Sequence, residues 1–223
     1  MFAGLFLLLA TSAFPQGNFL KKGQSGLGFS GAYAANRSAS GITGTASVVF
    51  GGVFDISFGL GWASYGSEDL TDLKATSLSP QLRAHVIKQN SSRSPVSLTL
   101  AVGHARDNFR SPDLAEAGYT YKANSLFVGA AISRDVRFSA KVFVQPYVGL
   151  THTSTTYTLI DDLGRMFSDK GGLASFELGL PLVYAFSWRT LLVVQPGLTF
   201  NKDTTTFAVS LGLVYVFNKS AGE

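Results

Sequence analysis

Apolar and small or polar side chains alternate along most of this chain, and the clearest example lies near its C-terminus. Between residues 207 and 217, every second position carries a large apolar group: Phe207, Val209, Leu211, Leu213, Tyr215 and Phe217. The intervening positions include Ala208, Ser210 and Gly212. A period of two residues predicts a β-strand. An apolar row of this length with aromatic ends is typical of a strand that crosses a lipid bilayer.

The same period recurs upstream and predicts further strands. One of the clearest has small or polar residues alternating with Ile56, Phe58, Leu60 and Trp62. The runs lie near residues 26–35, 43–53, 55–63, 77–86, 96–103, 126–132, 138–153, 176–184 and 192–200. With the C-terminal run they make about ten strands, and eight is the alternative because the first run is weakly marked.

Short and long connections alternate between these runs. The short ones lie near Asp55 and at residues 88–95, 134–137 and 187–189, whereas the longer, acid-rich ones are expected to be exposed loops at residues 66–74, 106–122 and 157–172. This alternation predicts an all-β fold, a transmembrane antiparallel up-and-down β-barrel. We expect the long loops outside the cell and both termini in the periplasm. The last strand is expected to pair with the first, because an open edge is unfavourable in lipid.

Three prolines fall inside the expected strands, each beside a glutamine: Pro80-Gln81, Gln145-Pro146 and Gln195-Pro196. Proline removes a hydrogen bond from the strand ladder and is normally confined to edges or bulges. We therefore expect β-bulges at these positions. The glutamines are expected to face the lumen and to satisfy the freed backbone groups.

The composition favours a membrane wall over a soluble surface. Charged residues make up 14% of the chain, against roughly 25% in soluble domains. A soluble β-sandwich or lipocalin is the structural alternative, but its interior would be apolar, whereas one row of each strand here is rich in Ser, Thr, Gly and Gln. The chain has no cysteine and no metal-ligand or cofactor motif, so no cofactor is expected. The net charge of +4 is scattered, which predicts no nucleic-acid partner.

The N-terminal segment has a different pattern. Residues 1–13 form an apolar run that is too short to span a bilayer, and small residues and Pro15-Gln16-Gly17 follow it. This pattern is typical of a secretory signal peptide, with cleavage expected between about residues 13 and 16. A buried N-terminal strand or helix is the alternative. We expect a signal peptide at residues 1–16 and a single barrel domain at residues 17–223.

Two segments resemble the small outer-membrane barrels of the OmpX/OmpA type. The hairpin at residues 51–61 is similar to the first periplasmic turn of that family, and residues 211–217 are similar to the signal that the barrel-assembly machinery recognises. The resemblance implies an integral outer-membrane protein that contacts lipid and lipopolysaccharide, is assembled through its C-terminal strand and is favoured to be a monomer. The chain departs from the family in its ten expected strands and in the residues 218–223 that follow the terminal Phe217.

The polar row of the strands predicts the lining of the lumen: Gln81, Arg83, His85, Lys141, Gln145, Tyr147, Glu177 and Gln195. A barrel of eight to ten strands is narrow enough for side chains to fill it, and buried charges need partners. We therefore expect a lumen mostly plugged by hydrogen bonds and ion pairs, with a small-solute pore as the alternative. Aromatic residues near the strand ends are expected at the two lipid interfaces: Phe54, Trp62, Phe138, Tyr184, Trp188, Phe200, Phe207, Tyr215 and Phe217.

Two enzymatic alternatives rest on few residues. His152 and Ser154 match the His-x-Ser pair of membrane-facing lipid A deacylases, but such a pair needs a carboxylate to orient the imidazole. Asp161 and Asp162 are expected in a loop, and Glu177 is expected to face inward. A surface protease would combine acidic pairs with a histidine at the rim, which Asp161, Asp162 and His152 match only in composition. We therefore expect a non-enzymatic protein with a structural or surface-interaction role.

Overall fold

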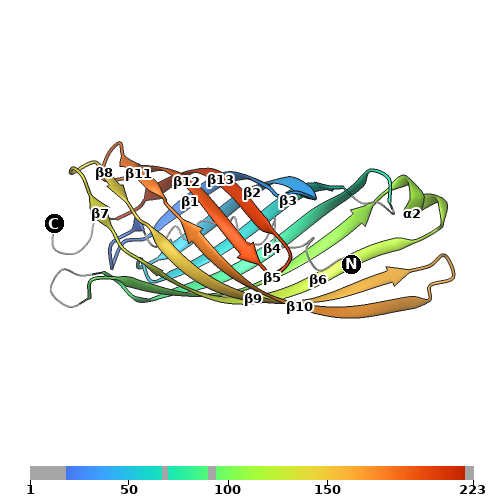
Figure 1. The fold of residues 1–223 in the computed structure, drawn as a ribbon. Coiled ribbons are helices and arrows are strands. Elements are labelled where there is room, and N and C mark those ends of the chain that lie inside the picture. Colours follow the sequence, from blue (N-terminus) through green and yellow to red (C-terminus); the bar gives the residue numbers. More distant parts are fainter. Residues whose placement is uncertain (1–18, 67–69, 90–93, 219–223) are drawn as a thin grey trace.

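The computed structural model describes residues 19–66, 70–89 and 94–218, most of which form β-strands (Figure 1). The expected signal peptide at residues 1–16 lies outside the described residues. A short helix, α2 (Pro112–Glu116), joins two of the strands. The strands are β1 (Gly26–Ala35), β2 (Ala39–Phe50), β3 (Phe54–Tyr65), β4 (Leu73–Ile87), β5 (Ser97–Arg110), β6 (Thr120–Ser133), β7 (Val136–Arg137), β8 (Val142–Val144), β9 (Tyr147–Ile160), β10 (Met166–Gly179), β11 (Leu182–Ala185), β12 (Thr190–Asn201) and β13 (Thr205–Val216).

These strands close into a barrel. All the pairings are antiparallel, and β1 pairs with β13 from Gly26 opposite Val216 to Ala35 opposite Phe207. The segments β7, β8 and β11 extend β6, β9 and β10 in the same register, so the wall is a closed barrel of ten strands. The expected fold class, the strand number of ten and the pairing of the last strand with the first are confirmed.

The tight turn between β2 and β3 follows directly from its sequence. Gly51 and Gly52 both have positive φ angles, 57° and 62°, and the Val53 N–H donates to the Phe50 carbonyl across 2.9 Å. Two successive positive φ angles define a type I′ turn, whose twist suits a β-hairpin. We call the barrel end that carries this turn and both described chain ends the turn end, and the opposite end the hairpin end (Figure 1).

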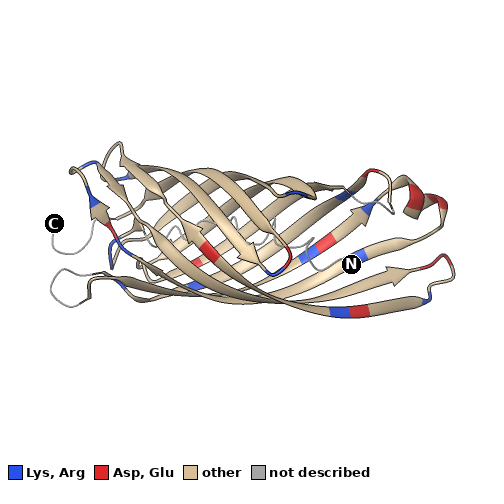
Figure 2. Cartoon of the chain, in the orientation of Figure 1, with Lys and Arg blue, Asp and Glu red and all other residues tan. Residues whose placement is uncertain are grey.

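Alternation along the strands separates an outer apolar face from an inner face. In β3 every second residue from Phe54 to Ser64 is exposed and every other one is buried. Charged residues are sparse along the wall and gather at its two ends (Figure 2). No helix among the described residues is long and apolar enough to cross a membrane. Of the expected interface aromatics, Phe200 is half-buried against Phe176, and eight are exposed: Phe54, Trp62, Phe138, Tyr184, Trp188, Phe207, Tyr215 and Phe217.

The structure corrects the long loops expected from the sequence. β5 continues to Arg110 and β6 begins at Thr120, so much of the expected loop at residues 106–122 is strand. Likewise β9 runs to Ile160 and β10 begins at Met166, which leaves only a short turn of the expected loop at residues 157–172. Backbone pairing continues where the outward side chains become polar, and the apolar period therefore does not mark the ends of these strands.

The expectation of β-bulges at the prolines is wrong. The register of β12 against β13 is continuous through Pro196, and the register is the same on both sides of Pro146. The described irregularity in the pairing of β4 with β5 lies between His85 and Ile87 and not at Pro80. Proline lacks a donor but keeps its carbonyl, and the Pro146 and Pro196 carbonyls accept hydrogen bonds from the backbone N–H groups of Arg134 and Leu180.

Candidate functional surfaces: the lumen and the hairpin end

Most of the residues expected in the lumen lie inside the wall. Gln81, Arg83, His85, Gln145 and Gln195 are buried. Tyr147 and Glu177 are half-buried on the same inner face.

Lys141 differs from the expectation, because it is exposed. The strand expected to begin at Phe138 starts only at Val142. The Ser139 hydroxyl accepts hydrogen bonds from the backbone N–H groups of Lys141 and Val142 and so holds Lys141 in a turn.

Hydrogen bonds between side chains occupy the middle of the lumen. Arg83 Nη2 donates to Gln81 Oε1 across 2.8 Å. On the opposite side, the Thr151 hydroxyl donates to Glu177 Oε1 across 2.8 Å. Two further bonds come from the glutamines beside the prolines: Gln195 Nε2 to the Tyr147 hydroxyl at 3.1 Å, and Gln145 Nε2 to Asp135 Oδ1 at 2.6 Å. These glutamine amides therefore bond to lumen side chains.

His85 lies between two partners that the sequence did not reveal. Its Nε2 is 3.2 Å from Asp55 Oδ2, and its Nδ1 is 3.0 Å from Thr99 Oγ1. The three residues come from β4, β3 and β5, so only the register of these strands brings them together. The order of carboxylate, imidazole and hydroxyl is that of a catalytic triad, but all three side chains are buried inside the wall. This arrangement ties three strands together on the inner face of the wall.

An apolar cluster lies at the turn end of the lumen. Phe19 and Leu20 precede β1 and pack against inward residues of the strands: Val49, Phe143, Val183, Leu191, Val193, Val214 and Val216. The Lys88 ammonium donates to the Leu20 carbonyl, and the Gly23 N–H donates to the Gly51 carbonyl across 2.8 Å. The segment at residues 19–24 is thereby held at the turn end of the barrel. We call it the N-terminal plug.

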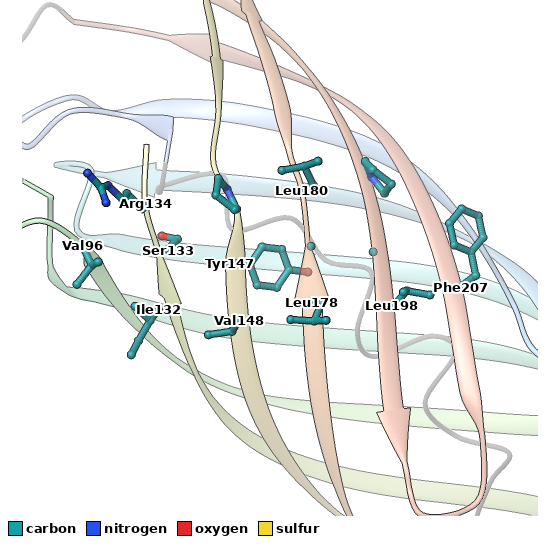
Figure 3. A pocket seen from close by; sticks show the side chains of 14 residues that line it. Val96, Ile132, Ser133, Arg134, Tyr147, Val148, Leu178, Leu180, Leu198 and Phe207 are labelled. Atoms are coloured by element: carbon teal, nitrogen blue, oxygen red, sulfur yellow. The ribbon is translucent and has the colours of Figure 1, made fainter. Parts of the chain in front are cut away.

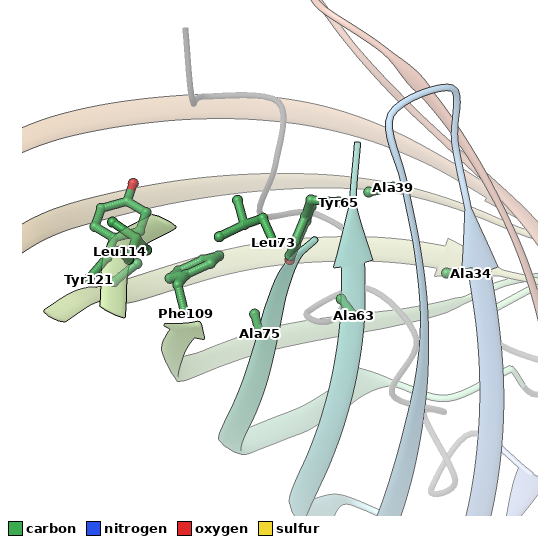
Figure 4. Packing of buried hydrophobic residues seen from close by; sticks show 10 residues of the cluster. Ala34, Ala39, Ala63, Tyr65, Leu73, Ala75, Phe109, Leu114 and Tyr121 are labelled. Carbon is green, nitrogen blue, oxygen red and sulfur yellow. The ribbon is translucent and has the colours of Figure 1, made fainter. Parts of the chain in front are cut away.

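Aromatic rings pack in series on the inner face of the barrel toward the hairpin end (Figure 4). The ring centroids of Tyr65 and Phe109 are 5.9 Å apart, those of Phe109 and Tyr121 are 4.7 Å apart, and those of Tyr121 and Tyr157 are 6.5 Å apart. Leu114 joins this cluster from α2, whose Ser111 cap accepts a hydrogen bond from the Leu114 N–H. The polar middle of the lumen thus has an apolar cluster on either side.

The β5–β6 hairpin, with α2 at its tip, and the β9–β10 hairpin reach furthest toward the hairpin end (Figure 1). We call residues 106–110, 120–124, 156–160 and 166–172 the hairpin extension. Its outward side chains are mostly polar, including Arg106, Asn108 and Lys122. Asp107 faces inward in this extension; burial raises its pKa to about 6, and the neighbouring Ser77 partly opposes the shift.

The outer half of β10 has a free edge. β10 pairs with β9 from Met166 to Gly179 but with β12 only from Ser175 to Gly179. The Leu180 N–H donates to the Pro196 carbonyl of β12. Because the backbone N–H and C=O groups of successive residues in a strand point to opposite sides, those of the other even-numbered residues of β10 point to this same side. Among the described residues, no strand covers that side from Met166 to Gly172.

The residues of the enzymatic alternatives do not form a catalytic arrangement. His152 and Ser154 are both exposed on the outer face. Within the described ranges, no carboxylate forms a hydrogen bond with His152, and Glu177 bonds to Thr151 on the inner face. Asp161 Oδ2 accepts a hydrogen bond from Arg165 Nε across 2.6 Å and so closes the β9–β10 turn.

Comparisons with known proteins place this fold among bacterial outer-membrane barrels. Neither a protein-family profile nor a curated protein sequence matches the chain. The translocator domain of the autotransporter NalP from Neisseria meningitidis is similar at 13% identity with a TM-score of 0.60, covering 91% of each chain. The β-domain of the Bordetella autotransporter BrkA is similar at 11% identity with a TM-score of 0.57, covering 87% of this chain and all of that one. The chain has the fold of an outer-membrane β-barrel, as the resemblance implied.

Proposed function

We propose that the protein is an integral outer-membrane barrel with a closed lumen, and that it acts by presenting its hairpin extension to partners outside the cell. The exposed apolar row of each strand supports insertion into lipid, because such a continuous surface is unfavourable in water. The short turns and the N-terminal plug would lie in the periplasm. The hairpin extension, whose outward face is polar, would lie in the external medium.

The observation that carries the interaction role is the free edge of β10. An uncovered edge offers a row of backbone N–H and C=O groups to another extended strand. Met166, Ser168 and Gly172 present such groups, while the Lys170 N–H is already bonded to Asp169 Oδ1 across 2.8 Å. This bond partly protects the edge, and the remaining groups stay open to strand addition.

The side chains along this edge suit an extended peptide. Gly171 and Gly172 leave the strand without side chains, and a Cβ atom at Gly171 would lie 3.3 Å from the Tyr157 ring. An apolar side chain of an added strand would therefore cover the glycines beside that ring. Asp169 lies on the same face as Gly171 and favours a basic residue opposite it. The partner is thus an extended segment with a basic and an apolar residue on one face.

A second barrel in the same membrane does not suit this edge. Barrel strands tilt by about 35–45° from the membrane normal. Two copies related by a rotation about that normal would therefore bring their β10 strands together at about twice this angle. Ladder hydrogen bonds need nearly parallel or antiparallel strands, so the edge favours a flexible partner.

Amide hydrogen exchange on the refolded protein tests the edge directly. The N–H groups of Met166, Ser168 and Gly172 should exchange rapidly, whereas those of Phe167, Gly171 and Leu173, which face β9, should be protected. A synthetic ten-residue peptide of alternating Thr and Val, with one Lys placed opposite Asp169, should slow the amide hydrogen exchange of Met166, Ser168 and Gly172. Ser168→Pro should abolish this protection, because proline removes a donor at the edge, whereas Ser168→Ala should retain it. If, without peptide, the edge amides were as well protected from exchange as the amides that face β9, the free edge would be contradicted.

A further inference from the structure

A groove of about 580 Å³ lies on the outer face of the wall, across β6, β9, β10 and β12 (Figure 3). Its sides are almost wholly apolar and include Ile132, Val148, Leu178, Leu180 and Leu198. Arg134 lies at one end of the groove and Phe207 at the other (Figure 3). The groove is therefore an elongated apolar surface with a cation at one end.

The groove lies where the strands carry small or compact side chains. Pro146 and Pro196 stand on its outer face with compact rings, and Gly179 and Gly197 contribute no side chain to the inner face. The Tyr147 ring occupies the space where a Gly179 Cβ atom would lie, and its hydroxyl is held by Gln195. The ring thus supports the floor of the groove from inside the barrel.

Arg134 is available to a ligand. Its side chain is exposed, and its backbone N–H is bonded to the Pro146 carbonyl at the edge of the groove. In the part of the chain that the structure describes, no carboxylate forms an ion pair with its guanidinium. The residue begins a short connection at the turn end of β6. Arg137 in β7, Lys141 just before β8 and Arg189 just before β12 belong to the connections at the same end, where several basic residues gather (Figure 2).

We propose that this groove binds one glycerophospholipid, with an acyl chain along the apolar floor and the phosphate on Arg134. Guanidinium binds phosphate through paired, charge-assisted hydrogen bonds, and a narrow apolar groove complements the shape of an acyl chain. The inference rests on the proposed membrane insertion. The phospholipid is preferred to lipopolysaccharide because the cation lies at the turn end, which faces the phospholipid leaflet in that orientation.

A second groove supplies an internal comparison. It also measures about 580 Å³ and lies on the outer face, bordered by apolar residues such as Phe29, Phe58, Leu211 and Leu213. No charged residue borders it. If volume and apolarity were sufficient, both grooves would hold lipid equally, whereas the proposal assigns headgroup selectivity to the groove with Arg134.

The test is native mass spectrometry of the refolded full chain in detergent, with phosphatidylglycerol, phosphatidylcholine or lipid A added in turn. Wild type should retain one phosphatidylglycerol in preference to phosphatidylcholine or lipid A. Arg134→Gln should lower that retention about fivefold, the effect of one basic residue near a charged lipid surface, and Arg134→Lys should recover part of it. Arg137→Gln removes a neighbouring cation outside the groove and should change retention less than twofold. Leu198→Trp should fill the groove and displace the lipid, whereas Leu213→Trp in the second groove should not.

The outcomes separate the site from the membrane location. Heat-modifiable gel migration first establishes that each variant is folded; loss of folding in wild type in detergent would count against the barrel itself. If the variants are folded and Arg134→Gln and Arg137→Gln lose equal amounts of phosphatidylglycerol retention, the proposal would be overturned in favour of nonspecific attraction by the basic residues at the turn end. Preferential retention of lipid A, or equal effects of Leu198→Trp and Leu213→Trp, would overturn it as well.

Discussion

Truncation of Leu20 tests whether the N-terminal plug is part of the folded core. Leu20 is 2% exposed and packs against Val49, Val193 and Val214 inside the turn end of the lumen. Replacing a buried leucine by alanine removes apolar contacts and leaves a cavity, which costs about 2–5 kcal/mol. We expect Leu20→Ala to lower the free energy of unfolding by about 3 kcal/mol, in the middle of this range.

The assay is equilibrium unfolding in urea of the refolded protein in detergent micelles, followed by the fluorescence of Trp62 and Trp188. Lys202→Ala is the control, because this side chain is 69% exposed in a turn at the hairpin end, and surface substitutions usually stay within about 0.5 kcal/mol. A Leu20→Ala variant as stable as Lys202→Ala would refute the reasoning that residues 19–24 belong to the folded core.

Three further predictions follow from the lumen and the wall. Asp107→Asn should stabilise the protein at pH 8 by up to about 3 kcal/mol, and this gain should vanish below about pH 4. The reason is that the pKa of Asp107 is higher in the folded state than in the unfolded chain, so wild type loses stability as the pH rises from the unfolded-state pKa to about 6. A gain of equal size at both pH values in urea unfolding would contradict this. Replacing Tyr215 and Phe217 by Asp should abolish accumulation in the outer membrane, because both rings are exposed at the end of the closing strand and lie 6.0 Å apart. Normal amounts of the double variant in membrane fractions would count against this prediction. Planar-bilayer recordings of wild type should show no steady channel openings, since apolar clusters occupy both ends of the lumen; steady conductance would favour the pore.

The wall of the barrel was predictable because lipid and lumen impose opposite demands on alternate residues. The period of two in β3 and β13 records that demand directly. The hairpin extension was not predictable in this way, because beyond the apolar band its outer face is polar and the contrast between the two faces fades. The sequence therefore indicated loops at residues where β5, β6, β9 and β10 continue.

The lumen was predictable in its polar middle but not in its layers. Val183 and Val193 occupy the inner row together with Gln195, and nothing in the period distinguishes a polar lining from an apolar closure. The contact of His85 with Asp55 depends on the register between β3 and β4, which local sequence does not specify. The free edge of β10 depends on how far β12 extends, which is a property of the whole sheet.

The claim that the barrel spans the outer membrane with its hairpin extension outside is tested most directly by cysteine labelling. The chain has no cysteine, so a single one can be introduced at Leu163, which is 73% exposed in the β9–β10 turn, or at Ser187, in an exposed turn at the other end. In intact cells, a membrane-impermeant maleimide should label Leu163→Cys and should label Ser187→Cys only after the outer membrane is permeabilised. Labelling of Ser187→Cys alone in intact cells, or recovery of both variants in the soluble fraction, would contradict the account.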